Sequence, residues 1–473
     1  MTRRWPLPVA AVFAALFWAG CGSTDVAAPP EPSVAVDTTP TATASADAPE
    51  AGVFTMEGHI GWLIGVLDAG EFASAEVTER FDASFLAQVP IAALNAPLGQ
   101  IAPPGSAPWR ILGDSRDDRV AEITVESADG TRLTITLALA STEPHQIEGL
   151  LLQPADTDLP EGYTLAQLDA DMAAFAPQTA LGIYDVTNGS CDAVHERNGD
   201  EPLAVGSIFK LWVLAELANQ VQLGTADWDE PLAVRAELRS NPAGGVYQLA
   251  DGDTLTLREY AEAMISISDN TATDQLIDRL GRQDIETAMA RAGVARPALN
   301  QPFLATRELF WLKYLADPPN PPDWYNADTD ERRTILADLG GKTVPWVLDP
   351  TRATEANAEG LSQDQPRNLD IEYFASPHDL CRTLVHLDDL ASRPGLEPVA
   401  DILSINPGAE LDDTTWTDVR FKGGSEPGVF ASAWWLERND GRQSVVVGLL
   451  NNPDTAFNQF AAAAVITNAI ALI

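Results

Sequence analysis

The segment 207–223 constrains the fold most, because it is expected to be helical and its apolar side chains point in nearly every direction. They are Phe209, Leu211, Trp212, Val213, Leu214, Leu217 and Val221. A helix that is hydrophobic all round lies in the middle of a domain. The same segment carries Lys210, and an unpaired buried charge is energetically costly. The lysine therefore calls for a chemical or structural reason.

Ser207 precedes Lys210 by three positions, so the two side chains share one face of a helix. At the first turn, Ser207 also lies at the positive end of the helix dipole. A partly desolvated lysine can lose its proton near neutral pH and act as a base for a neighbouring hydroxyl. The pattern alone favours the alternative, a capping serine and a lysine whose ammonium group reaches solvent.

A second polar group interrupts an apolar helical region at 256–280. Thr256 and Glu259 form a capping box, which predicts that a helix starts there. The helical pattern breaks at Ser268-Asp269-Asn270 and then resumes. Such a triplet is either simple capping or a way to present a hydroxyl and an amide to a bound molecule.

A third group, Lys422-Gly423-Gly424-Ser425, heads an expected edge strand. Glycines there let a backbone come close to a ligand, and the lysine adds positive charge. The alternative is a glycine bulge. Strands are expected at 180–186 and on both sides of the turn at 439–441, with helices between them. This order predicts one antiparallel sheet closed by the two ends of a domain over 163–473.

The region 51–160 has a different pattern. Apolar residues at helical spacing predict a helix at 57–70, and shorter helices are expected at 74–89 and 91–101. Three segments with strand character follow, at 119–127, 131–140 and 145–154. Helices followed by a curled antiparallel sheet predict a cone-like α+β domain, so the whole chain is assigned to the α+β class.

The N-terminus has the features of an export signal over 1–21, with basic residues followed by a short apolar run. Gly20-Cys21 resembles a lipobox, in which Cys21 would carry lipid, and a plain secretory signal is the alternative. Residues 22–50 are rich in Pro, Ala, Ser and Thr and are expected to be a disordered linker. The expected location is the outer side of the cell membrane, or otherwise the extracellular medium.

Charge and cysteine content exclude several functions. The formal charge of −40 becomes −42 when Arg3 and Arg4 leave with the signal, and the chain has only four lysines. This surface repels nucleic acid and anionic membranes, so a membrane contact is expected only through the lipid. No spacing of ligands indicates a metal site, and no cofactor is expected. Cys191 and Cys381 are interpreted as free and buried.

The three groups, in this order, resemble the serine β-lactamases of class A and the related penicillin-binding enzymes. The resemblance implies a β-lactamase/transpeptidase-like domain that uses Ser207 as the nucleophile of an acyl-enzyme and Lys210 as its base. Ser268 would relay protons to the leaving group. The implied substrate-binding residues are Asn270, Lys422, Gly424 and Ser425. The backbone N–H groups of Ser207 and Ser425 would form the oxyanion hole.

Two departures from the family pattern affect turnover. Gly423 replaces the hydroxyl residue that normally follows the lysine of the third group. The family's deacylating glutamate precedes a Ser/Thr-Pro that opens a helix, and here Ser376-Pro377 is preceded by an atypical insertion, 303–373. Its acids, which include Glu355, Glu359, Asp370 and Glu372, are interpreted as solvated surface residues. Without a base that activates water, slow deacylation is expected.

The region 51–160 resembles the steroid isomerase-like domain of a family of actinobacterial serine hydrolases and lipoproteins, and it is interpreted as a binding or packing module. The expected function is hydrolysis of a β-lactam or a related amide or ester by an exported serine hydrolase. One alternative is a D-alanyl-D-alanine peptidase or esterase with weak β-lactamase activity, acting on a peptidoglycan peptide or an ester. Another is a non-catalytic envelope-binding lipoprotein.

Overall fold

The structure is a computed structural model of the 473-residue chain. It describes residues 12–14, 53–89, 91–95, 98–102, 105–128, 130–155, 159–240, 245–315, 322–340, 366–409 and 411–473. The expected signal over 1–21, except for 12–14, and the expected linker over 22–50 lie outside these residues, as does the lipidation candidate Cys21. Within the described residues, no helix is long and apolar enough to cross a membrane.

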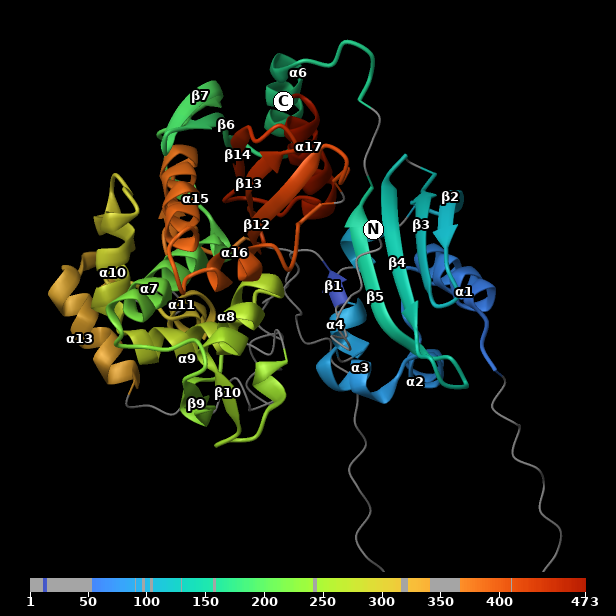
Figure 1. Ribbon diagram of the computed structural model, residues 1–473, viewed down its shortest axis with the longest axis horizontal. Helices are drawn as coiled ribbons and strands as arrows, with labels where there is room; N and C mark the ends of the chain where they lie inside the picture. Colours follow the sequence, from blue (N-terminus) through green and yellow to red (C-terminus); the bar gives the residue numbers. More distant parts are fainter. Residues whose placement is uncertain are drawn as a thin grey trace, which may run out of the picture.

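The N-terminal unit consists of short helices packed on one mainly antiparallel sheet, in the order β1-β5-β4-β3-β2 (Figure 1). Its helices are α1 (Met56–Ala69), α2 (Ser74–Arg80), α3 (Ala83–Gln88), α4 (Ile91–Asn95) and α5 (Leu98–Ile101). Its strands are β2 (Arg110–Arg116), β3 (Val120–Glu126), β4 (Arg132–Leu139) and β5 (Ile147–Pro154), and β1 (Val12–Ala14) pairs in parallel with β5. One cluster of buried apolar side chains joins the helices to the sheet.

Local chemistry explains the boundaries of these elements. Helix α1 begins at Thr55, whose side chain accepts a hydrogen bond from the Gly58 N–H, and ends at Gly70 with φ of 69°. The helix expected at 74–89 is two helices, because Asp82 caps α3 after the break at Phe81. Strand β2 was not predicted, since all seven of its residues are exposed and it shows no apolar alternation.

The C-terminal unit is built on a second antiparallel sheet, in the order β12-β13-β14-β6-β7. The strands are β6 (Gln178–Thr187), β7 (Ser190–Arg197), β12 (Trp416–Glu426), β13 (Val429–Arg438) and β14 (Gln443–Asn451). Strand β14 pairs with β6, so the two ends of the unit meet in one sheet as predicted. The architecture confirms the α+β class and the β-lactamase/transpeptidase-like fold of this unit.

Helices cover both faces of this sheet, and α7 (Lys210–Leu223) lies inside the helical layer (Figure 1). Its residues 210–219 are all buried, as the sequence predicted, and α8, α9, α10 and α15 surround it. The other helices are α6 (Leu165–Phe175), α8 (Leu257–Ser266), α9 (Asn270–Leu280), α10 (Arg282–Arg291), α11 (Thr306–Phe310), α12 (Pro322–Asn326), α13 (Thr329–Gly340), α15 (Pro377–Ala391), α16 (Pro398–Leu403) and α17 (Gln459–Ala471).

Short elements complete the C-terminal unit. Four short strands form two two-stranded ladders, β8 (Leu203–Ala204) with β11 (Phe374–Ala375) and β9 (Pro231–Ala233) with β10 (Thr254–Thr256). The single-turn helices are η1 (Gly206–Phe209), η2 (Ala236–Leu238), η3 (Val246–Gln248), η4 (Pro297–Asn300) and the π-helical turn η5 (Trp311–Leu315). The first ladder brings the chain just before Ser207 beside the end of the 303–373 insertion.

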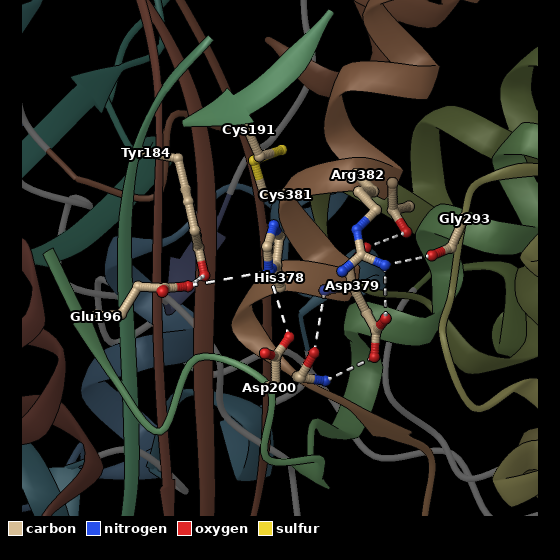
Figure 2. The surroundings of a disulfide bond; sticks show 11 residues. Tyr184, Cys191, Glu196, Asp200, Gly293, His378, Asp379, Cys381 and Arg382 are labelled. Atoms are coloured by element: carbon tan, nitrogen blue, oxygen red, sulfur yellow. Dashed lines mark hydrogen bonds and ion pairs between the residues drawn. A yellow bond between two sulfur atoms is a disulfide. The ribbon is translucent and has the colours of Figure 1, made fainter. Parts of the chain in front are cut away.

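Cys191 and Cys381 form a disulfide, so the prediction that both are free is wrong. The bond joins β7 to α15, and Figure 2 shows it beside His378 and Arg382 of the same helix. The two residues are 190 positions apart, and sequence spacing carries no information about a contact at that range. The hairpin β6–β7 and helix α15 lie side by side, which brings the two Cα atoms to 6.3 Å.

Helix α17 connects the two units. The Phe460 side chain is 2% exposed and belongs to the buried cluster of the N-terminal unit. The neighbouring Gln459 donates hydrogen bonds to the backbone carbonyls of Glu426 and Val429 at the β12–β13 turn. The N-terminal unit therefore packs against the same helix that contacts the end of strand β12.

Candidate active site

Ser207 lies in η1, immediately before α7, so the expected helix starts with a tight turn. Gly206 has φ of 49°, a left-handed conformation that favours glycine. The Val205 N–H donates to the carbonyl oxygen of Tyr373 (2.9 Å), and the Tyr373 ring stacks on Phe209 with ring centroids 3.6 Å apart. The turn that carries Ser207 is thus held from both sides.

Strand β12 runs directly against this turn. A Cβ atom placed on Gly424 would lie 2.0 Å from the Val205 carbonyl oxygen and 2.6 Å from the Ser207 nitrogen. A Cβ atom on Gly206 would lie 2.8 Å from the Ser425 nitrogen. Only glycine permits this approach of the two backbones. The backbone nitrogens of Ser207 and Ser425 consequently lie together, as two oxyanion-hole donors must.

Lys210 is fully buried at the base of the site. Its Nζ donates to the Ser268 carbonyl oxygen (2.6 Å), Asn270 Oδ1 (2.7 Å) and Ser268 Oγ (3.0 Å). Burial lowers the pKa of Lys210 to about 7, although Asp269 and Asp274 act in the opposite direction. A lysine with this pKa is neutral in a large fraction of molecules at physiological pH and is then able to accept a proton.

Lys422 reaches the same hydroxyl from the opposite side. Its Nζ donates to Ser268 Oγ (3.0 Å) and to the Gly423 carbonyl oxygen (2.7 Å). Burial, and then the charge of Lys210, keeps the pKa of Lys422 well below its usual value. A bound anion would offset both effects. One hydroxyl between two desolvated amines is suited to proton transfer.

The loop that carries Ser268 is rigidly anchored. Ser268 has φ of 59°, which is strained for a residue with a side chain. Asp269 is buried beside it and accepts hydrogen bonds from the Ala272 N–H (2.8 Å) and the Val246 N–H (2.9 Å). Burial raises the pKa of Asp269 to about 6, and these hydrogen bonds oppose that rise. The triplet therefore caps α9 and also holds the strained serine.

The structure brings Lys210, Ser268, Asn270, Lys422 and the 424–425 backbone together around the Ser207 turn. Ser207, Ser268 and Ser425 are partly exposed, whereas both lysines and Asn270 are buried. Lys422–Ser425 lie in the last half of β12 rather than at its start, and β12 is an edge strand as expected. The side-chain Oδ1 of Asn270 accepts a hydrogen bond from Lys210, so this amide also orients the lysine.

The acids of the 303–373 insertion differ from one another. Asp370 is exposed, as expected, but Glu372 is buried, so the interpretation of Glu372 as a surface acid is wrong. Lys313 pairs with Glu372 and Glu426, and its charge offsets that of one buried carboxylate. Glu355 and Glu359 lie outside the described residues. Among described groups, the carboxylates whose charge acts on Lys210 are Asp269 and Asp274.

Sequence reasoning missed the Lys313–Glu372–Glu426 group, and one feature pointed to it. The chain has four lysines and many arginines, so arginine supplies most of its positive surface charge. Each lysine is therefore a candidate for a specific role. Lys210, Lys313 and Lys422 are all buried, at 0%, 0% and 2% exposure. No three His, Cys, Asp or Glu side chains within the described part of the chain are arranged to hold a metal ion.

The fold and the site define a β-lactamase/transpeptidase-like protein with a serine at the start of its central helix. The chain belongs to the β-lactamase enzyme family, whose model matches residues 165–407, just over half of its length. A second model, described as the ORF 12 gene product N-terminal domain, matches residues 54–143. No curated protein matches the chain.

Solved structures show similar folds at low identity. A β-lactamase from Sphaerobacter thermophilus is 19% identical over 65% of this chain and 97% of its own, with a TM-score of 0.44. A β-lactamase from Chitinophaga pinensis is 16% identical over 65% and 96%, with a TM-score of 0.44. PBP-A is 17% identical over 68% and 100%, with a TM-score of 0.41. The family assignment rests on the family match and not on these likenesses.

Proposed function

We propose that the protein is a serine hydrolase that forms an acyl-enzyme through Ser207. The observation that carries this proposal is the complete burial of Lys210 one turn from Ser207, which lowers the pKa of Lys210 to about 7 and places its Nζ within hydrogen-bond distance of Ser268 Oγ. Neutral Lys210 takes the Ser207 proton as Oγ attacks the substrate carbonyl carbon. The oxyanion formed is stabilised by the N–H groups of Ser207 and Ser425.

Ser268 completes the step as a proton relay. As the carbonyl carbon–nitrogen or carbon–oxygen bond breaks, the leaving group takes a proton from Ser268 Oγ. A protonated lysine then returns a proton to that oxygen, since both Lys210 and Lys422 are within hydrogen-bond distance of it. The chemistry needs no cofactor, because every proton and electron pair is supplied by the substrate and these side chains.

The substrate class follows from Lys422. A substrate carboxylate beside this amine would stabilise its charged form and bind tightly, because Lys422 is desolvated and its pKa is low. β-Lactams and peptidoglycan peptides ending in D-alanine carry such a carboxylate next to the reactive amide. We propose a β-lactam or a related amide or ester as substrate. Its binding site would be lined by Asn270, Lys422, Gly424 and Ser425.

The slow deacylation expected from the sequence favours a second candidate, a D-alanyl-D-alanine peptidase or esterase with weak β-lactamase activity. The carboxylates that act on Lys210 within the described residues, Asp269 and Asp274, are both engaged in backbone hydrogen bonds. Neither is free to activate water. The lack of a hydroxyl at Gly423 removes one contact to a substrate carboxylate.

We also propose that the protein is exported and anchored through lipid on Cys21. The Cys191–Cys381 disulfide supports export, because such bonds persist in oxidising compartments and are rare in the cytosol. The N-terminal unit, for which a steroid isomerase-like fold is proposed, would act as a packing module through Phe460. Mass spectrometry of the mature N-terminus, for the wild type and Cys21→Ser, tests the anchor. A free N-terminus without lipid would refute it.

Intact-protein mass spectrometry after incubation with a fluorescent penicillin tests the catalytic proposal. The wild type and the surface control Ser404→Ala are expected to gain the mass of the drug, and Ser207→Ala is not. A persistent adduct supports the peptidase or esterase, and a transient adduct with hydrolysed drug supports a β-lactamase. If no adduct forms with the penicillin or with a simple ester, the non-catalytic binding protein is the correct function.

A further inference from the structure

Lys313 is a buried cation with no role in the chemistry above. It lies in η5, a π-helical turn, and such turns occur frequently at functional sites. Its ammonium group donates to the carboxylates of Glu372 and Glu426. The exposed fractions of these three side chains are 1%, 0% and 8%. The interactions join the 303–373 insertion to the end of strand β12.

Each carboxylate is attached to one wall of the oxyanion hole. Glu426 directly follows Ser425, so fixing its side chain fixes the Ser425 backbone. Glu372 directly precedes Tyr373, whose carbonyl oxygen accepts the Val205 N–H at 2.9 Å. Tyr373 also stacks on Phe209, on the other side of Ser207. Lys313 therefore bridges the strand of Ser425 and the segment that supports the Ser207 turn.

The charges of this cluster depend on pH. Burial, and then the facing Glu426 carboxylate, raises the pKa of Glu372 to about 8, against the effect of Lys313. At neutral pH the pair of carboxyl groups therefore keeps one proton, and the cluster of two glutamates and one lysine is neutral. The groups that face Glu372 are Glu426 from β12, Lys313 from η5 and the adjacent Tyr373. Burial raises the pKa of Tyr325 of α12, and the charge of Lys313 opposes that rise.

We propose that Lys313, Glu372 and Glu426 form a positioning cluster that holds the two backbone donors of the oxyanion hole at a fixed separation. The inference rests on the proposed acyl-enzyme function and adds residues that never touch the substrate. When the shared proton is lost, two buried carboxylates repel each other across a single ammonium group. The strand of Ser425 and the turn of Ser207 then separate, and the acylation rate falls on the alkaline side.

The test is the pH profile of Ser207 acylation by a fluorescent penicillin, measured as a second-order rate constant from pH 6 to 9.5. Glu372→Gln keeps the size of the side chain and its hydrogen-bonding capacity but removes the titration. It is expected to acylate at close to the wild-type rate at pH 7 and to lose the alkaline fall. Glu286→Gln is the matched control, because Glu286 is another buried glutamate in an ion pair, with Arg333, and glutamine keeps the acceptor for the Phe303 N–H.

Lys313→Met leaves two buried carboxylates without a cation. It is expected to slow acylation by about 10²-fold, the effect of a 1 Å misplacement of catalytic groups. If near-ultraviolet circular dichroism shows that this variant does not fold, the pH profile of Glu372→Gln alone tests the proposal. An alkaline fall that persists unchanged in Glu372→Gln would assign that limb to Lys422 and overturn the proposal. A wild type without any Ser207 adduct would instead refute the proposed function itself.

Discussion

A methyl group on Gly424 should disable the oxyanion hole without touching any side chain of the site. In the structure, the added Cβ of Gly424→Ala would lie 2.0 Å from the Val205 carbonyl oxygen and 2.6 Å from the Ser207 nitrogen. Contacts below 3.0 Å are essentially never seen for real Cβ atoms, and the nearest atoms here all belong to backbone. Strand β12 and the Ser207 turn must therefore separate by about 1 Å.

In the proposed acyl-enzyme mechanism, that separation would move the Ser425 N–H away from the developing oxyanion. Loss of one such donor costs about 10²–10³ in rate, or about 2.7–4 kcal/mol of transition-state stabilisation. We expect the acylation rate constant of Gly424→Ala with a fluorescent penicillin to fall by this factor. The midpoint of the acid limb of the pH–rate profile should not change, because the surroundings of Lys210 stay the same.

Gly245→Ala is the matched control, since an added Cβ there meets nothing within 4 Å and the backbone φ of −74° suits alanine. It should acylate at the wild-type rate. Urea unfolding of both variants separates a local effect from a loss of folded protein. Acylation of Gly424→Ala within threefold of the wild type, in a folded protein, would show that the close backbone approach does not position the donors.

Four further outcomes are expected. Lys210→Met should slow acylation by about 10²–10⁴-fold. In the wild type the rate should rise with pH up to about 7, before the alkaline fall expected above, because only the neutral amine of Lys210 accepts a proton; a rate independent of pH between 5 and 7 would contradict this role. Ser268→Gly should be more stable to urea than Ser268→Ala by about 1 kcal/mol, because the left-handed φ of 59° strains any residue with a Cβ. Replacing Cys191 and Cys381 by serine should lower the unfolding free energy by about 2–5 kcal/mol, and a reducing agent should then have no further effect on the melting temperature.

Residues that come together through local spacing were predictable from the sequence. Ser207 and Lys210 are one turn apart, and the Ser268–Asn270 triplet marks itself by interrupting an apolar helical pattern. The buried character of α7 followed from apolar residues in every direction. The closure of the sheet by β6 and β14 followed from the order of the strand patterns.

Contacts between distant segments were not predictable. The Cys191–Cys381 bond and the ion pairs of Lys313 depend on how β7, α15, η5 and β12 pack, and no local pattern encodes that packing. Glu372 lies between Ile371 and Tyr373, where a polar segment of the chain gives way to an apolar one, and its burial depends on how the chain around Tyr373 packs against the Ser207 turn. The sequence does not predict strand β2, because both of its faces are exposed and it lacks apolar alternation.

Phe460 has a consequence for how the protein tolerates division. This residue comes from the last helix of the chain, yet its ring fills a gap among apolar side chains of the first unit. A C-terminal fragment expressed alone would present this ring to water beside the β12–β13 turn. An N-terminal fragment would have a hole where the ring belongs. Separating the two units would therefore expose apolar surface on both fragments, and each fragment would be prone to association.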